Sequence, residues 1–101
     1  MSKYLHGERQ KAAIIQAAID LWHEAGAAAV TARGIGKRVG LSHAGVLFHF
    51  DGGITRLKWD VKCEAISRGD QKIIPQLITA DDPAVAHFTP DQRRAWLGVA
   101  G

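Results

Sequence analysis

The chain has 101 residues, of which 47% are hydrophobic, and a formal net charge of +3. This length fits one domain or one domain with an appendage, and the hydrophobic content excludes a disordered chain. The single cysteine, Cys63, excludes an intrachain disulfide and a multi-cysteine metal site. No apolar run approaches the roughly 18–20 residues of a membrane span, and the polar N-terminus lacks the apolar stretch of a signal peptide. We therefore expect a soluble, cytoplasmic protein.

The positive charge is concentrated in the middle of the chain. Between residues 33 and 58, five basic residues stand against one acidic residue, Asp51, whereas residues 61–101 hold five of each sign. Local basicity of this kind is typical of a phosphate-contacting surface. A solvated face of lysine and arginine has the same composition, so charge alone leaves both interpretations open.

Residues 8–25 are predicted to form an amphipathic helix that ends at Gly26 in a left-handed conformation. Its apolar residues recur at three- and four-residue spacing and form a stripe through Ala12, Ile15, Ala18, Ile19 and Trp22. Ile14 and Leu21 widen this stripe.

Two short helices are predicted next, each with a hydroxyl residue at its N-cap. Thr31 caps a helix over residues 32–39, Gly40 supplies a turn, and Ser42 caps a third helix that runs to about Phe48. This order is that of a helix–turn–helix, whose second helix fits the major groove of DNA.

The second of these helices has a weak intrinsic tendency to form. Gly34 and Gly36 each cost roughly 1 kcal/mol relative to alanine inside a helix. Packing by Ile35 and Val39 must therefore hold the helix in place.

Further helices are predicted after residue 53. One covers residues 54–68 and ends at Gly69, and another covers residues 72–79 with Pro75 in its first turn. Residues 89–92, Thr-Pro-Asp-Gln, have the spacing of a capping box with proline at the first helical position. We find no internal repeat and no low-complexity segment.

The predicted fold is all-α. A three-helix helix–turn–helix domain occupies residues 1–53, and residues 54–101 form a connecting fourth helix and a short helical C-terminal region. Because a chain this short buries a modest share of its surface, dimerisation through the second part is expected to help it.

Residues 9–57 resemble the DNA-binding domain of the TetR family of bacterial transcriptional repressors. The resemblance rests on the helix AAIIQAAIDLWHEAG, the motif T-x-R-x-I-x-x-x-x-G-L-S from Thr31 to Ser42, and the closing pair His49-Phe50. It implies a repressor that binds a palindromic double-stranded DNA operator as a homodimer, with the helix from Ser42 in the major groove. Carried over by position, the DNA-binding residues are Thr31, Arg33, Ser42, His43, Ala44, Gly45, Leu47, Phe48 and His49.

The charged residues around the turn add to this set. Arg33, Lys37 and Arg38 are expected to contact phosphates, which position a protein on DNA without reading the sequence. His43 is expected to reach a base edge or a phosphate. His49 suits either a phosphate contact or a structural place at the helix end. The two histidines are six residues apart and share no helix face, so no metal site is expected, and no cofactor is implied.

The apolar and small residues of the third helix have two interpretations. Ala44 and Gly45 suit either a close approach to DNA or tight helix packing. Leu47 and Phe48 suit contact with thymine methyl groups or a place in the core. Three predictions concern residues outside the third helix. Phe50 is expected in the core, and Cys63 is expected as a small apolar filler on the fourth helix. Trp96 and Leu97 are expected in a dimer contact or in the intramolecular core.

An alternative function belongs to another class. Leu47 stands where the family often has a phosphate-contacting tyrosine, and Asp51-Gly52-Gly53 replaces the usual Pro-Ser-Lys. These departures favour a helical interaction module that lost strong DNA binding and pairs with another regulator. The chain is much shorter than usual family members, so a fragment is a third hypothesis, and effector binding is left open. No nucleophile–base constellation or phosphate loop indicates an enzyme.

Overall fold

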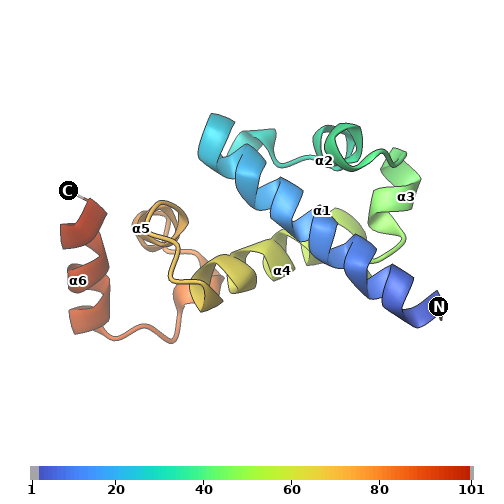
Figure 1. The fold of residues 1–101 in the computed structure, drawn as a ribbon. Coiled ribbons are helices and arrows are strands. Elements are labelled where there is room, and N and C mark those ends of the chain that lie inside the picture. Colours follow the sequence, from blue (N-terminus) through green and yellow to red (C-terminus); the bar gives the residue numbers. More distant parts are fainter. Residues whose placement is uncertain (1–2, 101) are drawn as a thin grey trace. The chain divides into compact units, whose positions relative to one another are not determined.

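In the computed structural model, which describes residues 3–100, the chain folds into helices joined by turns, without a strand in this part. The all-α prediction is confirmed. None of the described helices is both long enough and apolar enough to cross a membrane. The helices are α1 (Lys3–Ala25), α2 (Ala32–Val39), α3 (His43–Leu47), α4 (Gly53–Ser67), α5 (Ile73–Thr79) and α6 (Pro90–Ala100), with 3-10 turns η1 (Ala27–Ala29) and η2 (Pro83–Val85) (Figure 1).

The chain divides into two compact units, Met1–Val61 and Lys62–Gly101. The division falls within α4, whereas the boundary expected from the sequence lies at the start of that helix. The first unit therefore contains α1, α2, α3 and the first half of α4, and the second contains the rest.

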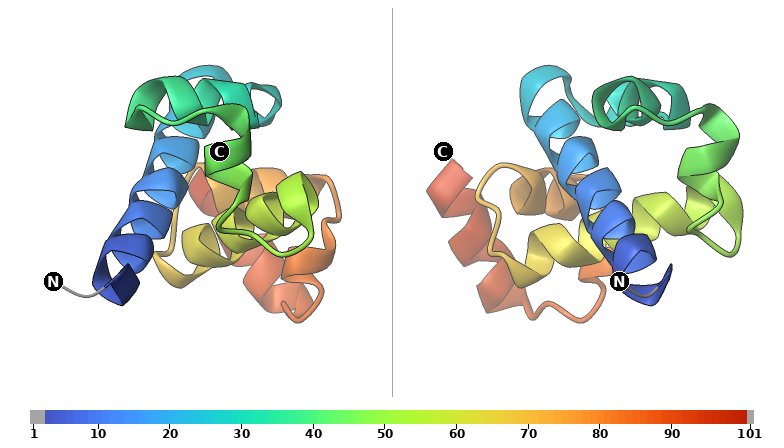
Figure 2. Two further views of the ribbon diagram at one scale, coloured as in Figure 1. Left: turned by 90° about the vertical axis from the view of Figure 1, so that its right-hand side faces the viewer. Right: turned by 45° about the vertical axis from the view of Figure 1, so that its right-hand side comes forward.

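The core of the first unit forms where α1 meets the helices that follow it. Ile14, Ala18 and Trp22 of α1 are buried, together with Ile35 of α2 and Val46 of α3. In Figure 2, α2 and α3 follow one another around a tight turn at one end of this unit. α2 has eight residues and α3 has five, and helices this short are not stable alone. Their packing with α1 in this core therefore stabilises both.

α1 begins at Lys3, five residues before the predicted start at residue 8, and two further details differ from the prediction. Ala12 is exposed, because the buried stripe runs through Ile14, Ala18 and Trp22 at four-residue spacing and Ala12 lies on another face. Gly26 has the expected positive φ of 90°, but its ψ of 174° is extended rather than left-handed helical, because the chain turns there into η1.

The second unit begins with a helix end that the sequence predicts correctly. Gly69 has a φ of +66°, and the backbone N–H of Asp70 donates to the carbonyl of Ala65 at 2.9 Å. This is the pattern of a glycine C-cap. The Asp70 carboxylate then accepts from the backbone N–H groups of Lys72 and Ile73, at 2.9 and 2.8 Å, which starts α5.

The ends of α5 and α6 also follow from sequence. Pro75 is the third residue of α5, where a backbone N–H has no partner within the helix. The proline therefore removes no hydrogen bond from α5. Thr89 and Gln92 form the predicted capping box: the Gln92 N–H donates to Thr89 Oγ1 at 3.1 Å, and the Thr89 N–H donates to Gln92 Oε1 at 2.8 Å.

The prediction for Cys63 is wrong. The buried positions of α4 are Leu57, Val61 and Ala65, which follow one another every four residues. Cys63 lies two positions after Val61, on the opposite side of the helix, and is exposed.

Candidate nucleic-acid interface

The N-terminus of α2 is fixed by Thr31. This residue has extended angles, and its Oγ1 accepts a hydrogen bond from the backbone N–H of Gly34 at 3.0 Å. The predicted cap is therefore confirmed. An ideal Cβ on Gly34 would lie 3.0 Å from the same Oγ1 atom, so the glycine leaves room for the cap.

Arg33 and Lys37 form the basic face of α2. They are four residues apart, so they lie about one turn from each other on the same face of the helix, and both are exposed. Within the described part of the chain, neither side chain is engaged in an ion pair. Their charges are therefore available to an anionic partner.

Arg38 lies in a different environment from its two basic neighbours. Its guanidinium binds the Glu24 carboxylate at the end of α1 through two hydrogen bonds, from Nη1 to Oε2 at 2.6 Å and from Nη2 to Oε1 at 2.5 Å. These hydrogen bonds lower the pKa of Glu24 and raise the pKa of Arg38. Arg38, expected to contact phosphate, is thus already paired, and it holds the end of α2 against α1.

The turn between α2 and α3 is built around one carbonyl oxygen. The backbone N–H groups of Gly40 and Leu41 both donate to the carbonyl of Gly36, at 2.8 and 2.9 Å. Gly40 has left-handed angles of 75° and 33°, as expected for the turn residue. These two hydrogen bonds to one carbonyl fix the direction in which the chain leaves α2 and enters α3.

α3 begins with the predicted Ser42 cap. Ser42 Oγ accepts from the backbone N–H of Gly45 at 3.0 Å, and Val46 anchors the helix in the core. His43 and Ala44 are exposed in the first turn, where they suit contact with an outside partner. Gly45 is half-buried, and an ideal Cβ there would lie 3.2 Å from Ser42 Oγ. Its small size therefore serves the cap.

The segment after α3 alternates between exposed and buried aromatic residues. Phe48 is 84% exposed, whereas Phe50 is buried with 4% exposed, which confirms the core prediction for Phe50. Leu47 is half-buried. The Phe48 ring is therefore open to contact with a partner, whereas Phe50 serves the core.

His49 is tied to α1. Its Nε2 lies 2.6 Å from Oε1 of Gln10, and the residue is half-buried. Because an amide oxygen only accepts, Nε2 carries the hydrogen. Nε2 of His49 is thus engaged with α1.

Sequence reasoning missed Trp59. This residue is 41% exposed on α4, and with Gly52, Thr55 and Arg56 it lines a shallow groove of about 380 Å³. Arg56 donates from Nε to Asp60 at 3.1 Å. Trp59 lies two positions after the buried Leu57, so its place off the apolar stripe was the signal that could have identified it.

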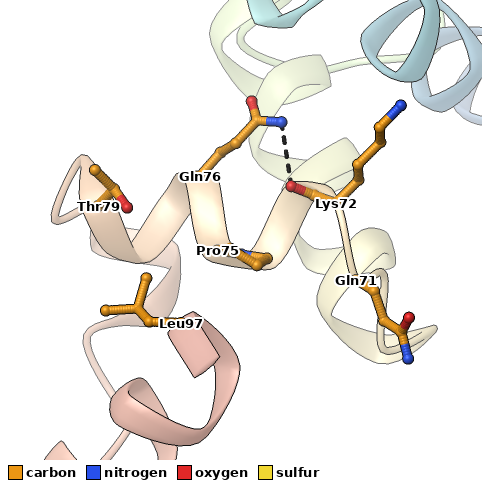
Figure 3. Close-up of a pocket in the computed structure, with 6 residues that line it drawn as sticks. All are labelled: Gln71, Lys72, Pro75, Gln76, Thr79 and Leu97. Carbon is orange, nitrogen blue, oxygen red and sulfur yellow. Dashed lines mark hydrogen bonds between the residues drawn. The ribbon is translucent and has the colours of Figure 1, made fainter. Parts of the chain in front are cut away.

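In the second unit, Trp96 and Leu97 have different surroundings. Trp96 is half-buried, and its ring lies 3.9 Å from the Cβ position of Gly69 within the same unit. Leu97 is 42% exposed and borders a groove of about 430 Å³ along α5, shown in Figure 3, where Pro75 and Thr79 lie near it. No group of three or more metal-ligating side chains occurs among the described residues.

These features define the class of the first unit. Two short helices with hydroxyl caps, a left-handed glycine turn and a bracing first helix make a helix–turn–helix DNA-binding domain. Residues 14–52 match the sequence profile of bacterial regulatory proteins of the tetR family, and this match supports a DNA-binding domain of that kind in the first unit. Members of this family are regulators rather than enzymes. No curated protein and no solved structure matches the chain.

Proposed function

We propose that the protein is a sequence-specific repressor of transcription that acts in the cytoplasm as a homodimer on a palindromic operator. α3 enters the major groove, and its residues read base edges. The observation that carries this proposal is a capped helix with exposed His43 in its first turn and exposed Phe48 directly after its end, which follows the unpaired cations Arg33 and Lys37.

The contacts divide into two kinds. Arg33, Lys37 and the hydroxyl of Thr31 lie at α2, and they suit phosphate contacts that set the register on the duplex. His43, Ala44 and Phe48 are exposed at α3 and its end, and they suit contacts in the groove. Ser42 and Gly45 shape the start of α3, and half-buried Leu47 and His49 support its end.

The geometry of a dimer sets a further expectation. Two copies would place their α3 helices about 34 Å apart, which is one turn of DNA, or a multiple of this distance. Exposed Leu97 and the groove beside it suit a contact between two copies.

A second candidate function is a helical interaction module that pairs with another regulator. The pairing of Arg38 with Glu24 favours it, because it removes a phosphate anchor from the surface, and the Leu47 side chain has no hydroxyl group to offer a phosphate. Salt separates the two functions: binding to DNA weakens steeply as ionic strength rises, and apolar pairing does not.

The experiment is a selection of bound sites from a random duplex pool with the purified protein, at two salt concentrations. The proposal expects an enriched palindrome whose half-sites lie one or more helical turns apart. Weak binding without an enriched sequence contradicts it and favours the interaction module.

A further inference from the structure

A chain of three side chains links α1 to the most exposed aromatic residue of the domain. Gln10 Oε1 accepts from His49 Nε2 at 2.6 Å. The His49 ring in turn meets the Phe48 ring edge to face, with 5.5 Å between centroids and 86° between planes. Gln10 and His49 are 39 residues apart in sequence, so the contact is tertiary.

α3 needs such a link because it is short. A helix of five residues is not stable alone, and the segment that follows it is anchored by Val46 and Phe50 in the core. Phe48 lies between these anchors and points outward, so neither of them fixes the direction of its ring. Among the described residues, the ring of His49 makes an aromatic contact with the ring of Phe48.

The hydrogen bond with Gln10 fixes two properties of His49. It places the hydrogen on Nε2, and it sets the rotation of the ring about its own side chain. Because His49 is half-buried and its ring is held by this bond, the ring presents a defined surface to Phe48. Aromatic pairs prefer such edge-to-face arrangements, which adds a preference for one orientation of Phe48.

We propose that Gln10 is a positioning residue for DNA reading, which acts through His49 to set the orientation of Phe48. The inference rests on the proposed function, since it concerns how α3 presents its side chains to bases. It assigns a role in specificity to α1, outside the helix–turn–helix itself. Gln10 does not need to touch DNA for this role.

The test compares Gln10→Met, which removes the acceptor at similar volume, with Gln10→Glu, which keeps an acceptor oxygen. Binding to the selected duplex and to a scrambled duplex of equal length is measured for each variant, and the ratio of the two affinities is the readout. Gln10→Met is expected to lower this ratio about fivefold, equivalent to the roughly 1 kcal/mol of one hydrogen bond. Its affinity for the scrambled duplex is expected to stay unchanged.

Gln10→Glu is expected to restore the ratio, even where its added negative charge weakens binding to both duplexes alike. A merely structural role would lower both affinities together and leave the ratio constant. Gln16→Met is the matched control, because Gln16 is exposed on the same helix and bonds Asp20 at 3.0 Å. In a His49→Ala background, Gln10→Met is expected to have no further effect on the ratio.

The outcomes separate the inference from the proposed function. If the wild-type protein does not distinguish the two duplexes, both are overturned. If the wild type distinguishes them and Gln10→Met has the wild-type ratio, the role of Gln10 is overturned and the proposed function stands.

Discussion

A side chain on Gly36 would overlap the carbonyl oxygen of Leu41, because the chain folds back over α2 directly after the turn. The same glycine carbonyl accepts the N–H groups of Gly40 and Leu41. A Cβ at this position can be accommodated only if the backbone of the turn shifts. We therefore expect Gly36→Ala to destabilise the first unit by about 1–3 kcal/mol, the usual cost of overpacking.

Denaturant unfolding followed by circular dichroism measures this effect. Gly7→Ala is the matched control, since Gly7 lies in α1 with open space around its Cβ position. Alanine there is expected to be neutral or to stabilise α1 by up to about 1 kcal/mol. Equal stability of Gly36→Ala and the wild type would show that the turn has another conformation in solution.

The two glycines of α2 show where sequence reasoning stops. Gly34 and Gly36 carry the same penalty in the sequence, because propensity depends on residue type alone. In the structure, Gly34 leaves room for the Thr31 cap and Gly36 leaves room for the returning backbone at Leu41. Such a difference depends on tertiary distances, which a single sequence does not contain.

Caps and turns, by contrast, are local and were predicted correctly. Thr31, Gly40, Ser42 and Gly69 each act within four residues of their own position, so short-range patterns are enough. The partners of exposed side chains are non-local. Arg38 with Glu24 and His49 with Gln10 join positions 14 and 39 residues apart, and no pattern in the sequence pointed to either pair.

The pairing of Arg38 leads to a prediction about salt dependence. Each phosphate contact contributes a slope of about −0.9 to the plot of log affinity against log salt concentration. Arg33→Ala combined with Lys37→Ala is expected to flatten the slope by about two and to weaken binding to all sequences. Binding titrations at several salt concentrations, with one duplex, measure it.

Arg38→Ala is the control for this measurement. Because Glu24 already neutralises Arg38, the slope of this variant is expected to match the wild type. A slope flattened as much by Arg38→Ala as by a change at Arg33 would mean that Arg38 leaves Glu24 to bind phosphate.

The second unit has a predicted dependence on acid. Burial disfavours the charge of Asp82, but hydrogen bonds from Lys62 Nζ at 2.6 Å and from the Ala84 N–H at 2.9 Å outweigh it, so the pKa of Asp82 lies below its ordinary value of 3.8. A carboxylate with a lowered pKa in the folded state stabilises the fold above its ordinary pKa. This contribution is lost as pH falls below 3.8 through the folded-state value.

Unfolding by urea between pH 6 and pH 2 tests this sign. Asp82→Asn is expected to be less stable than the wild type at pH 6, and the difference is expected to shrink toward pH 2. A difference that stays constant over this range would mean that the charge of Asp82 does not contribute, and that its loss acts through the capping of Ala84 alone.

The two phenylalanines after α3 provide a test of which aromatic residue serves the fold and which serves binding. Phe48→Ala is expected to change stability by no more than about 0.5 kcal/mol, since 84% of Phe48 is exposed. It is expected to lower affinity for the selected duplex and to leave binding to a scrambled duplex unchanged. Phe50→Ala removes a buried ring that also lies under the Lys11 ammonium at 5.1 Å, and a loss of about 3–5 kcal/mol is expected.

Thermal unfolding and binding titrations on the same preparations separate these effects. A folded Phe48→Ala protein that keeps its full preference for the selected duplex would remove Phe48 from the reading surface. His43 and Ala44 in the first turn of α3 would then be the exposed residues left to account for base reading. A preference lost in Phe48→Ala, with an unchanged melting temperature, would place the exposed ring in contact with the bases, where a thymine methyl group is its most suitable partner.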